Sequence, residues 1–275
     1  MKSILITGCS SGIGLDAAQR LASAGWRVFA SCRQQSDCDR LRAMGFESPR
    51  LDYTDPSSIE TALAEVLDAT GGTLDALFNN GAHSMNGLVE DLPTDGLRAI
   101  FEANLFGWHD LTRRVIPVMR AQGHGHIVQC SSALGLGYMT FRGAYAATKH
   151  ALEALSDTLR LELRDSGIHV VLIEPGPITT RFRRNGVPWF ERYIDWKSSA
   201  QRALYETRLV PRLYAETDAP DRFELPPSAV SDKLLRILAS DRPAPRHYVT
   251  TATWLTAILT RILPTRAVDR ILTRI

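Results

Sequence analysis

The feature that most constrains the fold is a regular alternation of short apolar runs with longer amphipathic stretches. It extends through the first two thirds of the 275 residues. Short apolar runs predict strands, and apolar residues at helical spacing predict helices. Strand–helix alternation is typical of an α/β fold with a Rossmann-type, doubly wound parallel sheet. The predicted strands are Ser3–Thr7, Arg27–Ser31, Ala76–Asn79, His126–Cys130 and His169–Ile173, and the predicted helices are Ile13–Ala24, Ser57–Asp68, Leu97–Ala121 and Gly143–Asp165.

Length and composition indicate a single domain that spans residues 1–275. A chain of 275 residues with 44% apolar content lies within the range of one α/β domain. After Pro175 the alternation is lost, and residues 181–225 mix arginine, proline and aromatic residues. We interpret that stretch as a substrate lid and not as a second domain.

Charge and cysteine content exclude several classes of protein. The net charge of +2 does not indicate nucleic-acid binding. The chain starts with a predicted strand and not with a signal peptide, and no apolar run reaches the roughly 18–20 residues that span a bilayer. The histidines show no metal-ligand spacing. Four cysteines are too few for a disulfide framework and predict free thiols in a reducing, cytoplasmic compartment: Cys9, Cys32, Cys38 and Cys130.

A glycine-rich loop follows the first predicted strand and leads into the first predicted helix. It reads Thr7-Gly8-Cys9-Ser10-Ser11-Gly12-Ile13-Gly14, with GxxxGxG spacing and not GxGxxG. Glycines there let backbone N–H groups approach a pyrophosphate, and the helix N-terminus adds partial positive charge. The loop favours a dinucleotide site, with an ordinary βα turn as the alternative.

The end of the second predicted strand bears on the choice of cofactor. It reads Ala30-Ser31-Cys32-Arg33 and lacks the acid that binds the ribose hydroxyls of NAD. Arg33 can form a charge-assisted contact with a 2′-phosphate. We therefore expect NADP(H), with a solvated surface arginine as the alternative.

A tyrosine and a lysine begin the last of the predicted helices. Tyr145 and Lys149 are four residues apart and share one helix face. Free tyrosine has a pKa of about 10, and an adjacent ammonium, together with the positive charge of an oxidised nicotinamide, is expected to lower that value. Ser132, at the end of a predicted strand, can donate a hydrogen bond to a substrate oxygen where negative charge develops. Together the three residues predict proton transfer to a carbonyl oxygen or from an alcohol.

The motifs together resemble the single-domain branch of the short-chain dehydrogenase/reductase family. The family usually reads Asn-Asn-Ala-Gly where this chain has Gly81-Ala82 in the last two positions. If the fourth position needs a positive φ, Ala82 carries a conformational cost, and we expect an altered cofactor affinity. The matching elements, in the family's order, are Thr7–Gly14, Asp52, Asn79-Asn80-Gly81-Ala82, Asn104, Ser132, Tyr145, Lys149 and Pro175-Gly176-Pro177-Ile178-Thr179-Thr180.

The resemblance implies catalytic roles and a mode of assembly. Ser132, Tyr145 and Lys149 would be catalytic, and Asn104 would hold a water in the proton relay behind Lys149. In the resembled family the two long helices pair across subunits, so we expect a homodimer or homotetramer. A stripe of leucines on the second of these helices fits such a contact or core packing equally: Leu152, Leu155, Leu159 and Leu163.

The resemblance also implies a set of cofactor contacts. Asp52 would bind the adenine amino group, Asn80 and its neighbours would line the ribose side, and Thr180 with Ile178 would hold the carboxamide. The full set is Gly8, Ser10, Ser11, Gly12, Ile13, Gly14, Arg33, Asp52, Asn80, Gly81, Tyr145, Lys149, Pro175, Gly176, Ile178 and Thr180.

Aromatic residues in the lid bear on the substrate. In the resembled family this segment covers the substrate, so aromatic side chains favour a bulky apolar one, although a lid that packs on its own domain would look the same. The resemblance is nearest to hydroxysteroid- and retinol-dehydrogenase-like members and to bacterial aldehyde reductases. It implies reduction of an aldehyde, retinoid-like or steroid-like carbonyl, or the reverse oxidation. The aromatic residues are Phe182, Trp189, Phe190, Tyr193 and Trp196.

Two other functions remain as alternatives. A sugar-nucleotide epimerase or dehydratase shares the glycine loop and the Tyr-x-x-x-Lys pair, but such chains are longer. A non-catalytic regulator that senses NADP(H) needs only the cofactor half of the site, so the complete Ser132, Tyr145 and Lys149 set argues against it.

The C-terminal segment is basic and amphipathic. Residues 242–275 hold six arginines and one aspartate. Three arrangements fit residues 252–275: a helix over the substrate cleft, a subunit contact, or a basic helix at a membrane surface. We favour the first, with contact to the inner face of a membrane as a second role. The apolar positions at helical spacing are Trp254, Leu255, Ile258, Leu259, Ile262 and Leu263.

Overall fold

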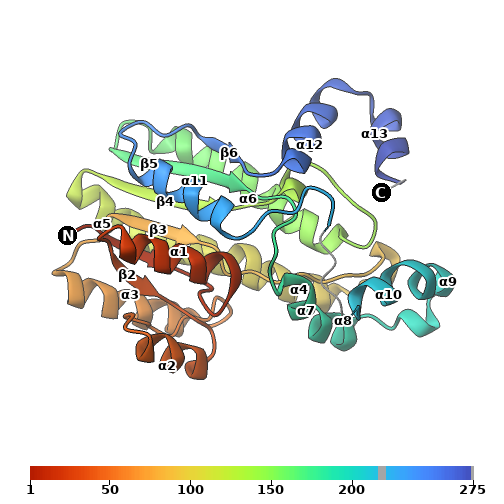
Figure 1. Cartoon of the computed structure of the whole chain (residues 1–275), viewed down its shortest axis with the longest axis horizontal. Coiled ribbons are helices and arrows are strands. Elements are labelled where there is room, and N and C mark those ends of the chain that lie inside the picture. Colours follow the sequence, from red (N-terminus) through yellow and green to blue (C-terminus); the bar gives the residue numbers. More distant parts are fainter. Residues whose placement is uncertain (216–220, 274–275) are drawn as a thin grey trace.

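The core of the fold is one parallel sheet of six strands in the order β2-β1-β3-β4-β5-β6, seen in the computed structural model (Figure 1). The structure describes residues 1–215 and 221–273. β1 and β3 are buried along their whole length, as expected when helices cover both faces of a parallel sheet. The strands are β1 (Ser3–Ile6), β2 (Arg27–Ala30), β3 (Ala76–Asn79), β4 (Gly125–Cys130), β5 (Ile168–Glu174) and β6 (Arg246–Tyr248).

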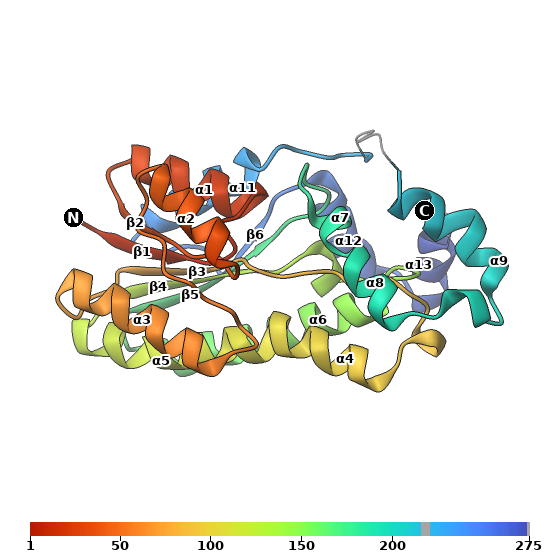
Figure 2. The same cartoon turned by 90° about the horizontal axis from the view of Figure 1, so that it is seen from below.

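Helices cover the sheet on both faces, which confirms the predicted doubly wound fold. α1 and α11 pack together on one face, while α3, α5 and α6 lie on the other (Figure 2). The four predicted helices are present, but the third divides into α4 and α5 around a π-helical turn at Glu102–Phe106. The bounds are α1 (Gly12–Ser23), α2 (Gln35–Ala43), α3 (Pro56–Thr70), α4 (Thr94–Phe101), α5 (Gly107–Gln122), α6 (Gly143–Glu162) and α11 (Ser228–Leu238).

Outside the lid and the C-terminal segment, two helices and one strand were not predicted. α2 is polar and buries only two residues, so its apolar periodicity is weak. α11 lies in the region where the alternation is lost, although its five buried residues pack against α1 and β5. β6 has three residues, all half-buried, and pairs in parallel with the end of β5. Three residues are too few to show an alternation of apolar and polar residues in the sequence. The stability of such a short strand depends on its pairing with β5.

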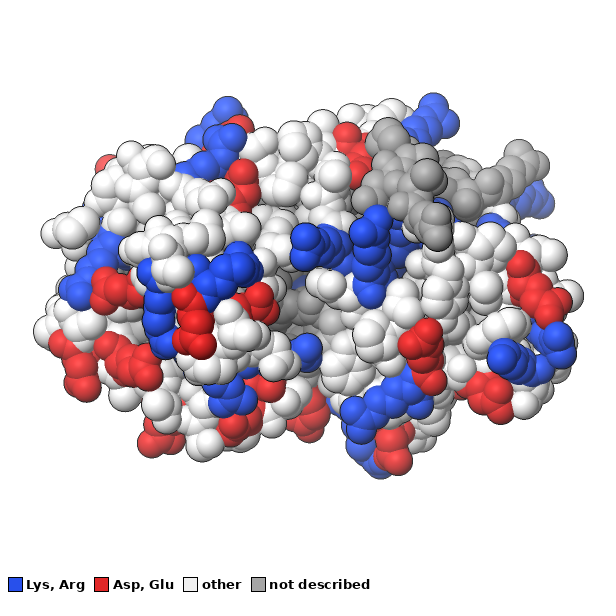
Figure 3. All heavy atoms as spheres, turned by 60° about the horizontal axis from the view of Figure 1, so that its bottom comes forward, with Lys and Arg blue, Asp and Glu red and all other residues white. Residues whose placement is uncertain are grey.

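The predicted lid is a group of short helices beyond the carboxyl ends of the strands (Figure 1). Its inner residues form a small core of their own, separate from the core around the sheet. On the face shown in Figure 3, basic side chains gather in the recess between the lid and the half that carries the glycine-rich loop. Residues 216–220 of the predicted lid lie outside the described residues. The lid helices are α7 (Phe182–Asn185), α8 (Val187–Tyr193), α9 (Arg202–Leu204) and α10 (Val210–Leu213).

The C-terminal segment forms two helices, α12 (Thr251–Ile262) and α13 (Thr265–Leu272), separated by Pro264. α12 packs on the 3₁₀ turn Ala133–Gly135 and buries small residues, Thr253 and Ala257. Several apolar residues expected to be buried are exposed instead: Trp254 (54%), Leu255, Ile258 and Ile262 (73%). Arg274 and Ile275 lie outside the described residues. No helix in the described part of the chain is long and apolar enough to cross a bilayer.

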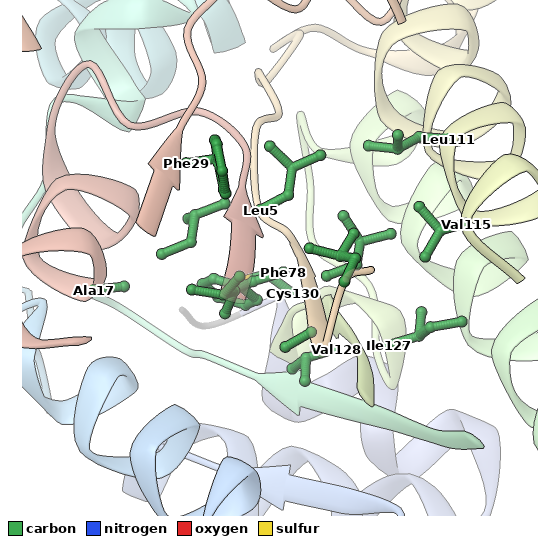
Figure 4. Packing of buried hydrophobic residues seen from close by; sticks show 14 of the residues in the cluster. Leu5, Ala17, Phe29, Phe78, Leu111, Val115, Ile127, Val128 and Cys130 are labelled. Atoms are coloured by element: carbon green, nitrogen blue, oxygen red, sulfur yellow. The ribbon is translucent and has the colours of Figure 1, made fainter. Parts of the chain in front are cut away.

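The main core lies on both sides of the sheet and ends at the candidate site. Leu111 and Val115 of α5 pack toward the strands from one side, and Ala17 of α1 packs from the other (Figure 4). Cys130, the last residue of β4, belongs to this core. The residues just beyond Cys130 are therefore held by a packed scaffold. All four cysteines are buried and free.

Candidate active site

The structure brings the three predicted catalytic residues together at the carboxyl end of β4. Ser132 lies just after the strand, where its Oγ accepts a hydrogen bond from the N–H of Leu134 over 3.1 Å. Tyr145 and Lys149 lie in the first turns of α6 and are 7% and 1% exposed. Burial of a phenol and an ammonium side by side is costly unless each is paired, so their surroundings are informative.

Lys149 is held by a carbonyl and an aromatic ring. Its Nζ donates a hydrogen bond to the backbone oxygen of Cys130 over 2.8 Å and lies 4.1 Å from the centre of the Trp108 ring. The indole Nε1 of Trp108 in turn donates to the backbone oxygen of Gly81 over 2.8 Å. Burial lowers the pKa of Lys149 to about 8, although Cys130 and Glu153 oppose the change. The ammonium therefore titrates close to neutral pH.

The pKa of Tyr145 is raised above its ordinary value, contrary to the lowering expected from the sequence. Burial is the largest cause and Cys130 adds to it, while a hydrogen bond with Ser132 and the charge of Arg142 lower the value. The Nζ of Lys149 lies 5.7 Å from the centre of the tyrosine ring and donates its hydrogen bond to the backbone oxygen of Cys130. Desolvation of the phenolate therefore outweighs the ammonium. In this state Tyr145 is a neutral proton donor.

Asn104 lies in the π-helical turn between α4 and α5 and is fully buried. Its side chain accepts a hydrogen bond from the N–H of His83 over 3.1 Å and donates to the carbonyl of His83 over 2.9 Å. The turn packs against α6, which carries Tyr145 and Lys149. Asn104 thus fixes the loop after β3, and π-helical turns are common at functional sites.

The glycine loop has the close backbone contacts that a dinucleotide site requires. Gly8 and Gly12 have φ values of +70° and +59°. A Cβ on Gly8 would lie 2.5 Å from the Cα of Gly81, and one on Gly14 would lie 2.4 Å from the oxygen of Gly8. Side chains at these positions would collide with the chain itself, so the tight packing of the loop against the start of α1 and the end of β3 requires glycine. Ser10, Ser11 and Ile13 complete the loop, and Ser11 makes no side-chain cap bond at the start of α1.

The exchanged Gly81-Ala82 pair does not strain the backbone. Outside glycine, positive φ values in the described residues occur only at Phe141 and Phe223, so Ala82 does not carry the cost considered above. Gly81 provides the close approach, because a Cβ there would lie 3.2 Å from the nitrogen of Gly8. The neighbouring Asn80 donates from Nδ2 to the carbonyl of Thr7 over 3.0 Å and ties β3 to the glycine loop.

A second arginine, on the helix that follows Arg33, contacts the glycine loop. Arg33 is exposed after β2, while Cys32 is buried. Arg40 on α2 donates from Nη2 to the backbone oxygen of Ser10 over 2.6 Å. Arg40 was not predicted from the sequence, because only the fold brings α2 to the loop. Asp52 is half-buried, and its Oδ1 accepts two hydrogen bonds from Thr54.

The Pro175–Thr180 segment lies opposite the glycine loop. A Cβ on Gly12 would meet the methyl group of Thr180 at 2.9 Å. A Cβ on Gly176 would lie 2.1 Å from Oγ1 of Thr250, the residue that caps α12. The Pro175 carbonyl accepts from the N–H of Ala133, next to Ser132, over 2.8 Å. Ile178 packs on the main core. The two predicted cofactor segments therefore meet at the site.

Aromatic side chains of the lid divide between two roles. The ring of Phe182 packs edge-on against Tyr145, with centroids 5.3 Å apart. Trp189 stacks on His83 at 3.9 Å, with Tyr193 behind it. Phe190 is fully buried in the core of the lid, where Trp196 also packs. Part of the lid thus contacts Tyr145, and part packs on itself.

A family model described as short chain dehydrogenase matches residues 2–190, which include the glycine loop, Ser132, Tyr145 and Lys149. This chain belongs to the short-chain dehydrogenase/reductase family. The family consists of oxidoreductases that use a nicotinamide cofactor, and the cradle formed by Gly8, Gly14 and Gly81 fits such a group.

Relatives and solved structures agree with this assignment. An uncharacterized oxidoreductase, YbbO, from Escherichia coli is 43% identical over 98% of this chain and 94% of its own. The NADPH-dependent 3-dehydrocapnine reductase of Ornithobacterium rhinotracheale is 29% identical over 98% of this chain and 96% of its own. A short-chain dehydrogenase from Streptomyces avermitilis has a TM-score of 0.79 and 29% identity, covering 99% of this chain and 95% of its own.

Proposed function

We propose that this member of the family is an NADP(H)-dependent enzyme that interconverts a carbonyl compound and an alcohol. The observation that carries the proposal is the meeting of Ser132, Tyr145 and Lys149 at the carboxyl end of β4, across from the glycine loop. A regulator that only bound the cofactor would need no such set, so this arrangement favours an enzyme.

The chemistry assigned to the chain is proton transfer at the substrate oxygen. When bound, the cofactor supplies or accepts the hydride. Tyr145, held neutral by burial, donates its proton to the carbonyl oxygen during reduction. Ser132 supports the developing charge on that oxygen with a hydrogen bond. Lys149 holds a positive charge near the phenolate that remains, and we propose that Asn104 holds a water through which the proton is replaced.

The preference for the phosphorylated cofactor rests on two arginines. Arg33 follows β2 where the family's NAD-binding members carry an acid, and Arg40 contacts the glycine loop beside it. A 2′-phosphate between two guanidinium groups would gain charge-assisted hydrogen bonds. The reductase from Ornithobacterium, which is similar along nearly its whole length, is described as NADPH-dependent. Asp52 is proposed to contact the adenine, and Ile178 and Thr180 the nicotinamide carboxamide.

The proposed substrate has a bulky apolar body. Phe182 and Trp189 lie over Tyr145 and His83, so a bound substrate would contact aromatic surfaces. Human retinol dehydrogenase 8, 35% identical over 66% of this chain and 60% of its own, is named for an apolar alcohol. The class includes long aldehydes and retinoid-like or steroid-like compounds.

We also propose a cytoplasmic homodimer or homotetramer, with the C-terminal helices able to contact a membrane. Phe106, Leu155 and Leu161 are exposed near or on the two long helices and offer an apolar contact surface. The exposed side chains of α12, together with nearby arginines, have the composition of an interfacial helix. Light scattering at micromolar concentration tests the assembly, and a particle of one chain's mass would contradict it.

One screen tests the function as a whole. The purified protein is mixed with NADPH and a panel of aldehydes, ketones, steroids and retinoids, and absorbance of the reduced cofactor is followed. We expect consumption with at least one apolar carbonyl, a slower rate with NADH, and loss of turnover in Tyr145→Phe. Equal turnover by Tyr145→Phe, or a preference for NADH, would contradict the corresponding part of the proposal.

A further inference from the structure

A group of buried polar side chains lies beneath the lid, outside the set used above. His83, Ser84 and Asn86 follow β3 and are almost fully buried. Each has one polar side-chain atom that has no partner in the described part of the chain, namely Nε2, Oγ and Nδ2. A buried polar atom without a partner costs free energy, and such atoms are rare in folded proteins. Three in one loop therefore indicate a place for a polar group.

Arg142 adds a positive charge to this group. It precedes α6 and lies three residues before Tyr145, and its Nη1 donates a hydrogen bond to Oδ1 of Asn86. That neutral amide is the only hydrogen-bond partner of the Arg142 side chain in residues 1–215 and 221–273. Burial and the charge of Arg212 lower the pKa of Arg142 to about 10, so the guanidinium stays charged at neutral pH.

The charges around Arg142 favour an anion. Arg212 and Arg183 act on it with like charge, and Asp221 acts on it with opposite charge. Asp221 is held by Arg212 at 2.7 Å and makes no ion pair with Arg142 in the described residues. The half-buried guanidinium of Arg142 meets only a neutral amide side chain in the described residues, so its charge is incompletely compensated there. An oxyanion would supply the missing charge and accept its remaining hydrogen bonds.

The site of this charge is close to the proposed reaction. Arg142 caps the start of α6 three positions before Tyr145, and the charges of the two side chains act on each other. Gly186, between α7 and α8, closes over the group, since a Cβ there would lie 2.2 Å from Oγ of Ser84. Phe182 contacts Tyr145 from the same part of the lid. An anionic group here would therefore sit at the polar end of an otherwise apolar enclosure.

We propose that Arg142, with Asn86 and Ser84, binds a carboxylate carried by the substrate near its reacting carbon. The inference rests on the proposed carbonyl–alcohol activity and narrows it to oxo acids and hydroxy acids with a long apolar chain. The planar guanidinium matches a carboxylate with paired hydrogen bonds, while Nδ2 of Asn86 and Oγ of Ser84 supply further donors. Binding requires α7 and α8 to move outward from Ser84.

The test compares an acid with its neutral ester. The wild-type protein is assayed with NADPH and 4-oxododecanoate or its methyl ester, which differ only in the charged group. We expect kcat/KM for the acid to exceed that for the ester at least ten-fold. Arg142→Met should bring this ratio close to one, mainly by raising KM for the acid, and Arg142→Lys should keep part of it. Arg208→Met removes an exposed lid arginine and should leave the ratio unchanged.

The outcomes separate the two proposals. If both compounds are reduced with equal kcat/KM, the carboxylate site is refuted and the carbonyl–alcohol activity stands. If neither is reduced, calorimetry with the protein and NADP⁺ decides the site, and equal affinities for acid and ester would overturn it. Circular dichroism and NADPH binding check that Arg142→Met folds. If it does not, the comparison of wild type with Arg142→Lys decides.

Discussion

Arg246 on β6 donates a hydrogen bond over 2.7 Å to Glu174, the fully buried last residue of β5. The same guanidinium binds Glu153 and Asp157 on α6. Glu153 lies one turn beyond Lys149 and opposes the lowering of the pKa of that lysine by burial. One arginine thus contacts two buried carboxyl groups, one on β5 and one on α6, the helix that carries Tyr145 and Lys149. Burial, followed by the charge of Glu153, raises the pKa of Glu174 to about 8.

This pairing predicts a dependence of stability on pH. Because the folded-state pKa of Glu174 is raised from 4.5 to about 8, the folded protein binds a proton there that the unfolded chain releases. Its contribution to stability is therefore present at low pH and is lost as pH rises from about 5 to 8. Glu174→Gln should remove this loss. One pKa unit corresponds to about 1.4 kcal/mol, so the difference between variant and wild type should change by more than about 1 kcal/mol across that range. Urea unfolding of both proteins at each pH measures the free energy of unfolding. Curves of that free energy against pH that run parallel for variant and wild type would contradict the prediction.

Catalysis should depend on the transferable proton of Tyr145. Tyr145→Phe keeps the ring that packs against Phe182 but removes the hydroxyl. We expect kcat to fall by at least about two orders of magnitude, the scale of general acid–base catalysis, with NADPH binding nearly unchanged. Stopped-flow turnover and fluorescence titration measure the two effects. Near-normal turnover would rule out Tyr145 as the proton donor.

The reduction rate should fall at alkaline pH because Lys149 loses its charge. Its pKa is lowered to about 8, so the ammonium is present below that pH and is lost above it. The profile of kcat/KM for reduction should therefore decline above about pH 8. Lys149→Arg should move the decline to higher pH, since arginine stays charged. A profile that is the same in both proteins would assign the decline to another group.

Cofactor preference should depend on both Arg33 and Arg40. Removal of either arginine should weaken the binding of NADPH more than that of NADH, because only NADPH carries the 2′-phosphate. A charged hydrogen bond contributes roughly 1.5–3 kcal/mol, so the ratio of the two dissociation constants should shrink about ten- to hundred-fold in Arg33→Ala or Arg40→Ala. Arg98→Ala, an exposed arginine of α4, serves as the control. If neither variant differs from this control, the two arginines do not bind the phosphate.

The C-terminal helices should affect bulky substrates more than small ones. α12 packs on the turn that follows Ser132, and Tyr138 donates a hydrogen bond to Asp269 of α13 over 2.7 Å. Deletion of residues 252–275 should raise KM for a steroid or long aldehyde and change that for a short aldehyde little. An unchanged KM for both substrates would show that the C-terminal helices do not cover the substrate site.

Contact with a membrane has its own test. Ile262→Asp alters a side chain that is 73% exposed and should leave the packed face of α12 intact. Sedimentation with anionic vesicles should fall in this variant, and in wild type it should fall with salt, which screens charges over about 10 Å at 0.1 M. If neither wild type nor variant sediments at low salt, the exposed face is not a membrane contact.

Local patterns in the sequence predicted five of the six strands, the long helices and the spacing of Tyr145 and Lys149, because periodicity and helix geometry depend on near neighbours. The direction of the pKa shift of Tyr145 could not be predicted in this way, since burial depends on the whole enclosure. Contacts between residues distant in the sequence could not be predicted from local patterns either. Arg40 contacts Ser10, Arg142 contacts Asn86, and Arg246 contacts Glu174, which lies 72 positions earlier in the chain. A single sequence records residue types along the chain, whereas charge compensation depends on which of them the packed sheet brings within hydrogen-bond distance.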